Sequence, residues 1–176
     1  MDQPNPNTLA EQGKQEYEQG AYLAAADLFS RAAQSYASTQ DPLNAAEMKN
    51  NQSVALLQAG KAKEALQATD GTEEIFQKAG DIRRQGIAVS NRAAALEGMK
   101  KWKEALAEYD RAAVLFEQIG AGDMHSIVRK AAANLNLKHG RITDSQMDVY
   151  DSLRLVEKPT LSQRLMKFLM RIGLVK

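Results

Sequence analysis

Small and bulky side chains alternate along this chain in a pattern that returns every 40 residues. The clearest copies are Ala25-Phe29-Ala32 and Ala105-Tyr109-Ala112, separated by two periods (105 − 25 = 80). Residues that are three, four or seven positions apart share one face of an α-helix. A fixed period of this length is typical of stacked helical units. The pattern therefore predicts an all-α array in which small residues let neighbouring helices approach closely.

Glycines mark the ends of the predicted helices, because a left-handed residue commonly terminates an α-helix. Gly20, Gly60 and Gly140 fall in one column of the 40-residue alignment, with Lys100 as the exception. With the apolar periodicity, they predict eight helices, over residues 8–19, 22–39, 42–58, 62–80, 81–97, 102–120, 124–139 and 143–156.

Capping residues refine these boundaries. Thr8, with Glu11 three residues later, is a candidate capping box, and Asp41 and Asp81 are candidate N-caps. Gly71 lies inside the fourth predicted helix, where glycine costs about 1 kcal/mol relative to alanine. We interpret it as a tolerated weak spot in a continuous helix rather than as a functional kink.

The columns resemble the tetratricopeptide repeat, in a long variety with a 40-residue period. The small–aromatic–small signature carries the resemblance, together with Gly20 and the aromatic Tyr22 two residues later. The second and fourth copies are weaker, with Thr69 and Val149 at the bulky position. The resemblance implies a right-handed α-solenoid of four helix pairs with a C-terminal capping helix. We expect a disordered lead over 1–7, a repeat domain over 8–157 (repeats about 8–40, 41–80, 81–120 and 123–157), and a C-terminal amphipathic helix over 160–174.

The resemblance also implies a peptide-binding groove, lined by the first helix of each pair. Asn51 and Asn91 lie one period apart beside the groove positions and either hold the backbone of a bound peptide or bridge neighbouring helices. Lys130 and Asn134 resemble half of the family's carboxylate clamp, but in the wrong repeat, so a generic anion contact is the milder interpretation. The complete predicted groove set is Lys14, Tyr17, Glu47, Asn50, Asn51, Val54, Leu57, Ile87, Ser90, Asn91, Ala94, Ile127, Lys130, Asn134 and Leu137.

The C-terminal segment has two interpretations. Its apolar residues share one helical face, its charged residues are all basic, and a predicted interaction face is formed by Leu165, Phe168, Leu169 and Ile172. Such a helix can cap the last apolar face of a repeat array. It can also bind a membrane surface or a partner, which includes a second copy of the chain.

Composition narrows the function further. Lys and Arg number 23 against 22 Asp and Glu, so the net charge of +1 gives no support to a nucleic-acid partner. No cysteine is present, and no secretion signal or membrane-spanning run appears, so the expected location is the cytoplasm.

His125 and His139 are about 21 Å apart on one predicted helix and are interpreted as surface or loop-end residues. No catalytic, cofactor-binding or metal-binding motif appears. We therefore expect a non-enzymatic scaffold or adaptor that binds a peptide or a partner helix in the groove. The alternative is a membrane-peripheral assembly factor or a homodimer that uses the C-terminal helix.

Overall fold

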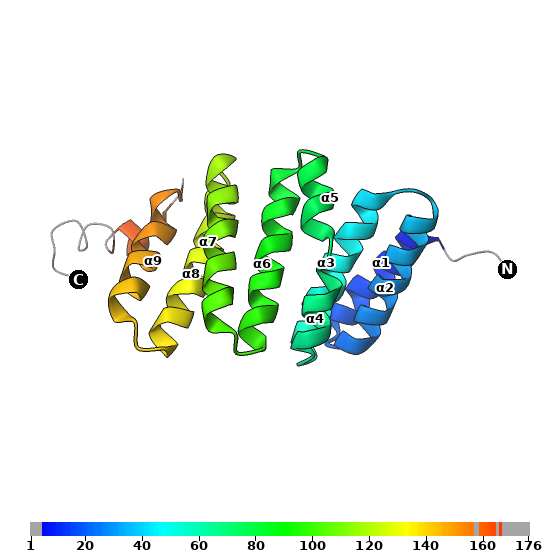
Figure 1. Ribbon diagram of the computed structural model, residues 1–176, viewed down its shortest axis with the longest axis horizontal. Helices are drawn as coiled ribbons and strands as arrows, with labels where there is room; N and C mark the ends of the chain where they lie inside the picture. Colours follow the sequence, from blue (N-terminus) through cyan, green and yellow to red (C-terminus); the bar gives the residue numbers. More distant parts are fainter. Residues whose placement is uncertain (1–4, 157–158, 165, 167–176) are drawn as a thin grey trace. The chain divides into compact units, whose positions relative to one another are not determined.

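The computed structural model describes residues 5–156, 159–164 and 166. Within them the chain forms the labelled helices α1 to α9, further helical residues at 161–164 and 166, and no strand (Figure 1). The predicted all-α class is confirmed. The helices are α1 (Pro6–Glu18), α2 (Tyr22–Ser38), α3 (Pro42–Gln58), α4 (Ala62–Ala68), α5 (Thr72–Lys78), α6 (Ile82–Gly98), α7 (Trp102–Gln118), α8 (Gly122–Lys138) and α9 (Ile142–Arg154). They belong to two compact units, Met1–Ala105 and Leu106–Lys176, and α7 starts in the first unit and continues in the second.

A 20-residue register sets the helix boundaries. Helices begin at residues 22, 42, 62, 82, 102, 122 and 142. Each complete step consists of a 17-residue helix and a three-residue turn, except that the helical part of the step from residue 62 is divided into α4 and α5. Every turn contains one residue with a positive φ between 59° and 80°, and two of the seven are not glycine. These left-handed positions are Gly20, Gln40, Gly60, Gly80, Lys100, Gly120 and Gly140. The exception in the glycine column, Lys100, thus adopts the conformation that the column requires.

Two of the predicted N-caps are present, and one is wrong. Asp41 accepts a hydrogen bond from the Asn44 backbone N–H at 3.1 Å, and Asp81 accepts one from Arg84 N–H at 2.8 Å. The predicted capping box at Thr8 is wrong, because α1 already begins at Pro6. The Asn5 side chain caps it by accepting from the backbone N–H of Asn7 at 2.9 Å.

The continuous helix predicted over 62–80 is also wrong, because it divides into α4 and α5 at Gly71. Gly71 has a φ of 76°, which terminates a helix rather than merely weakening it. Threonine hydroxyls on each side of the break donate to nearby carbonyls, Thr69 to Leu66 O at 2.7 Å and Thr72 to Thr69 O at 2.8 Å. Such local bonds compete with regular helix, so the threonines and the glycine act together.

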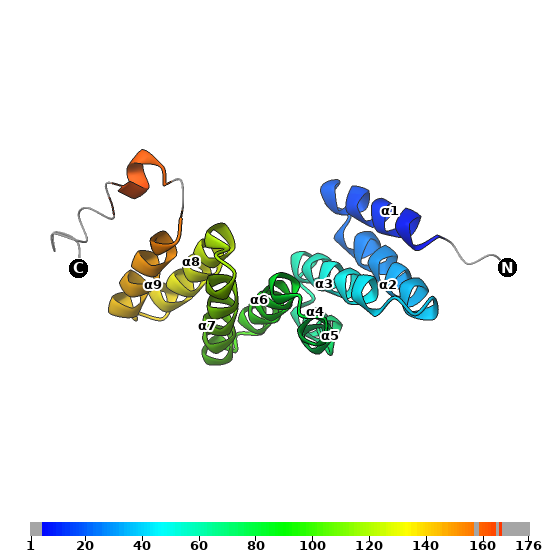
Figure 2. The same cartoon turned by 90° about the horizontal axis from the view of Figure 1, so that it is seen from above.

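In the first unit, α2 lies against α1 on one side and α3 on the other (Figure 2). Its signature residues Ala25, Phe29 and Ala32 are at most 3 % exposed. Gly13 of α1 makes the close approach possible, since a Cβ atom there would lie 2.8 Å from the Phe29 ring. The small–aromatic–small residues of α2 are therefore buried, and the helices approach closely, as the sequence predicted.

In the second unit, α8 and α9 lie side by side (Figure 1). Ala112, Phe116 and Val128 are at most 4 % exposed and belong to its buried apolar residues. Gly122, the first residue of α8, lies close to the end of α9, because a Cβ atom there would lie 2.1 Å from the Leu155 carbonyl oxygen. The start of α8 is thus fitted directly against the backbone at the end of α9.

Candidate functional site

A pocket of about 220 Å³ in the first unit gathers several of the predicted groove residues. Lys14 and Tyr17 come from α1, while Asn51 and Val54 come from α3, and the structure brings all four together around Phe29. The remaining lining residue is Glu18. Because the contributing helices are distant in the sequence, only the packing of α1 and α3 on α2 creates this cavity.

The local geometry explains how the pocket is held open. The Tyr17 ring meets the Tyr22 ring edge-on, with centroids 5.3 Å apart and planes at 61°. This aromatic contact fixes one wall of the pocket. Lys14 Nζ lies 3.6 Å from Glu11 Oε2, and both side chains are more than half exposed. An exposed pair of this kind contributes little and is readily exchanged for another partner.

The structure uses other predicted groove residues of the first unit for internal packing. Glu47 pairs with Arg84 of α6 at 3.2 Å, and the Ser90 hydroxyl donates to the Ile87 carbonyl within α6. Asn50 is 4 % exposed, with its Oδ1 buried and unpartnered in the described part of the chain, so it is not a surface contact. The remaining predicted positions, Leu57, Ile87, Asn91 and Ala94, are half-buried.

In the second unit, the predicted positions on α8 form an exposed stripe. Ile127 is 66 % and Leu137 58 % exposed, and Lys130 and Asn134 between them are exposed as well. Large apolar side chains at this exposure are available to a partner. The predicted C-terminal face, Leu165, Phe168, Leu169 and Ile172, lies outside the described residues, and its roles as cap, membrane contact or dimer contact stay predictions.

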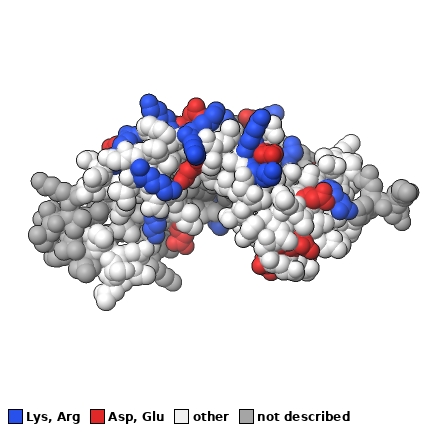
Figure 3. Space-filling model, turned by 90° about the horizontal axis from the view of Figure 1, so that it is seen from below, with Lys and Arg blue, Asp and Glu red and all other residues white. Residues whose placement is uncertain are grey.

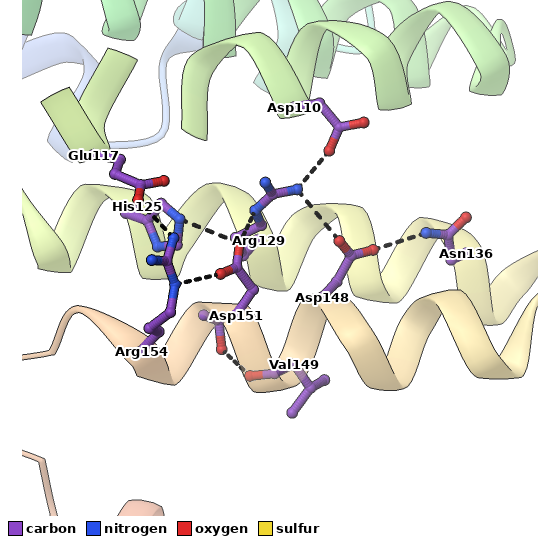
Figure 4. Close-up of polar contacts among 10 residues, drawn as sticks. Asp110, Glu117, His125, Arg129, Asn136, Asp148, Val149, Asp151 and Arg154 are labelled. Atoms are coloured by element: carbon purple, nitrogen blue, oxygen red, sulfur yellow. Dashed lines mark hydrogen bonds and ion pairs between the residues drawn. The ribbon is translucent and has the colours of Figure 1, made fainter. Parts of the chain in front are cut away.

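A polar cluster links α7, α8 and α9 in the second unit, and the sequence did not predict it (Figure 4). Arg129 of α8 is its centre, with pairs to Asp110, Asp148 and Asp151. Its Nε lies 2.6 Å from Asp151 Oδ2. Arg154 extends the cluster by pairing with Asp151 at 2.9 Å and with Glu117 of α7 at 2.8 Å. These ion pairs tie the three helices of the unit together.

His125 belongs to this cluster and corrects a prediction, because it is fully buried rather than a surface residue. Its Nε2 lies 3.4 Å from Asp151 Oδ2, yet neither ring nitrogen makes a hydrogen bond among the described residues. Burial lowers the pKa of His125, with the cations Arg129 and Arg154 acting in the same direction and the nearby carboxylates opposing. Burial likewise raises the pKa of Asp148, against the hydrogen bond donated by Asn136.

The 20-residue register is the signal that could have found the buried histidine. Counting in steps of 20 from Ala25 passes through Ala45, Ala65, Gln85 and Ala105, all buried, and reaches His125. The pairs around it carry no such signal, since Arg129 and Asp148 are ordinary helix residues until the helices pack.

Three further observations concern surface charge, metal ligands and membrane spans. Basic and acidic side chains lie close to one another on the face in Figure 3, with no field of a single sign. Among the described residues, no three His, Asp or Glu side chains form a group that could hold a metal ion. No helix in that part of the chain has both the length and the apolar character needed to cross a bilayer.

Stacked helices that begin every 20 residues from residue 22 to residue 142, with a lateral pocket between them, define a helical-repeat protein of the interaction class. The chain belongs to the soluble NSF attachment protein family, whose sequence model matches residues 13–175. This is a family of helical, non-enzymatic adaptors with a solenoid fold similar to tetratricopeptide repeats. The helical-repeat expectation is therefore confirmed, while the long tetratricopeptide variety stays a prediction. No curated protein matches the chain.

Proposed function

We propose that this protein is an adaptor that holds a segment of a protein partner in the groove between α1 and α3. The observation that carries the proposal is the pocket in which Lys14 and Tyr17 face Asn51 and Val54. An adaptor needs a concave apolar surface with a few polar groups that orient the bound chain. This pocket has that composition.

The lining residues offer a partner three kinds of contact: apolar, amide and charged. Tyr17 and Val54 offer apolar surface over the buried Phe29, and a cavity of about 220 Å³ suits a side-chain anchor rather than a whole ligand. The Asn51 amide can donate to a carbonyl and accept from an N–H of an extended backbone. Lys14 can leave its exposed pair with Glu11 for an acidic group of the partner.

The stripe on α8 supplies a second contact in this proposal. Ile127 and Leu137 offer exposed apolar surface, and Lys130 and Asn134 between them offer polar groups of the same kinds as in the pocket. The stripe is a separate contact surface, carried by the second unit alone.

The partner class follows from the family. Its name refers to attachment of NSF, and the family binds SNAREs and NSF. We propose a protein partner for this chain, and SNARE proteins and NSF are the first candidates to assay.

The test is a comparison of two charge-reversed variants of the full chain. Lys14→Glu combined with Asn51→Ala changes the pocket, whereas Lys63→Glu changes an exposed lysine on α4 that does not line it. In pull-downs with purified candidate partners and from lysate, the double variant should fail to bind a partner that the wild type and Lys63→Glu both bind. Circular dichroism should show an unchanged fold for both. If the folded double variant retains every partner of the wild type, the proposal is wrong.

A further inference from the structure

The first unit contains a second and larger pocket, of about 590 Å³, between α2, α3 and α5. It lies on the other side of α3 from the proposed groove. Lys49 lines the large pocket and Asn51 lines the small one. A two-residue step turns an α-helix through about 200°, so these side chains point in opposite directions. The large pocket is therefore independent of the proposed partner site.

Small side chains and a broken helix create this space. Ala33 and Ala37 of α2 face Ala45 and Ala46 of α3 across the pocket, and alanine leaves room that a larger side chain would fill. The far wall is Ile75 of α5, the short helix that follows the break at Gly71. The threonine–glycine interruption of the second repeat thus coincides with the cavity.

The described lining of the pocket is mostly apolar and contains a single charged residue. Its floor is apolar, its rim carries Ser30 and glutamine amides such as Gln34 and Gln52, and Lys49 is the one charged residue among the described residues that line it. Lys49 is exposed and has no ion pair in the described part of the chain. A pocket of this volume with mostly apolar walls and a few polar groups has the composition of a small-molecule site.

From this lining we infer that the pocket binds an amphiphilic carboxylate, with its aliphatic body against the alanine floor and its carboxylate at Lys49. An aliphatic chain gains free energy from burial against apolar walls. A single anionic head group complements the single ammonium and can accept hydrogen bonds from the glutamine amides. A cationic head group would meet Lys49 with the same sign of charge, and a neutral one would leave the ammonium without a partner.

Isothermal titration calorimetry on the full chain with decanoate, decan-1-ol and decylamine tests this inference. We expect decanoate to bind most tightly and Lys49→Glu to weaken it about tenfold or more, which is the size of one charge-assisted contact. Ala37→Trp, which fills the mouth of the pocket at an exposed position, should abolish binding. Ser38→Trp on the same helix and Lys63→Glu are the matched controls, and neither residue lines the pocket.

The outcomes distinguish this site from the groove. Decanoate binding should be unchanged in the Lys14→Glu, Asn51→Ala variant, and loss of binding there would place the ligand in the groove and overturn the inference. Equal affinity for decanoate and decan-1-ol would overturn the role of Lys49. Full binding by folded Ala37→Trp, or no binding of decanoate by the wild type, would overturn the site itself.

Discussion

Gly122→Ala tests the packing of the second unit, because the structure leaves no space for a methyl group at this position. The added Cβ atom would lie 2.1 Å from the Leu155 carbonyl oxygen. Carbon–oxygen contacts in proteins begin at about 3.3 Å, so the end of α9 must move by about 1.2 Å (3.3 − 2.1). The obstacle is backbone, which cannot rotate aside as a side chain can.

Two opposing effects determine how much Gly122→Ala changes the free energy of unfolding. Overpacking of this kind costs about 1–3 kcal/mol, whereas replacing a helical glycine by alanine gains at most about 1 kcal/mol. Because the obstacle is backbone, the cost falls at the upper end of that range, and we expect a net destabilisation of about 2 kcal/mol (3 − 1). The exchange of backbone amides in α9 should be accelerated more than that in α2. The free energy of unfolding from urea denaturation and hydrogen exchange read by mass spectrometry measure these two quantities.

Two comparison variants make the prediction specific. Gly13→Ala also meets a close neighbour, at 2.8 Å, but that neighbour is the Phe29 ring, so we expect a smaller loss and faster exchange in α1 rather than α9. Asp123→Ala changes an exposed residue in the first turn of α8, and we expect at most about 1 kcal/mol. If Gly122→Ala is as stable as the wild type, or if its exchange changes uniformly along the chain, the proposed contact between α8 and α9 does not exist.

Three further predictions concern the polar cluster and the helix break. Arg129→Met should lower the free energy of unfolding by about 3 kcal/mol in urea denaturation, since it leaves the largely buried Asp148 carboxylate without its cation, whereas Asp151 keeps Arg154; an unchanged value would mean that the pairs are not formed. His125→Ala should flatten the pH dependence of stability below pH 6.5. The lowered pKa of the folded histidine means that the unfolded chain binds the proton first, so wild-type stability is lost as pH falls below the ordinary histidine pKa of 6.5; a variant with the wild-type pH profile would refute this. Gly71→Ala should cost about 1–2 kcal/mol in thermal or urea unfolding because alanine disfavours a φ of 76°, and a stabilised variant would indicate that the helix can run through the break.

The repeat columns predicted the fold because they record packing directly. Ala25, Phe29 and Ala32 contact neighbouring helices wherever the array continues, so their spacing carries the helical face and the period. Turn positions were predictable for a similar reason, since the left-handed conformation selects glycine in five of seven turns. Lys100 and Gln40 show that the turn, rather than the residue type, is the repeated feature.

The features that the sequence did not predict depend on cooperation between residues. Gly71 alone is compatible with a continuous helix, and the break requires the competing hydroxyls of Thr69 and Thr72. The ion pairs of Arg129 depend on which faces of three helices meet, and a periodic pattern does not contain that information. Groove positions taken from a resemblance fall on α1, α3, α6 and α8, and they did not separate Asn51, which lines a pocket, from Asn50, which is buried.

Site-specific photocrosslinking tests the adaptor proposal most directly. A benzophenone amino acid in place of Lys14 sits at the pocket, and the same residue in place of Lys63 on α4 serves as the matched control. After irradiation in lysate, mass spectrometry should identify a protein adduct at position 14 that is absent at position 63 and is lost when Asn51→Ala is added. Identical adducts at both positions, or an adduct at position 14 that is indifferent to Asn51, would contradict the account.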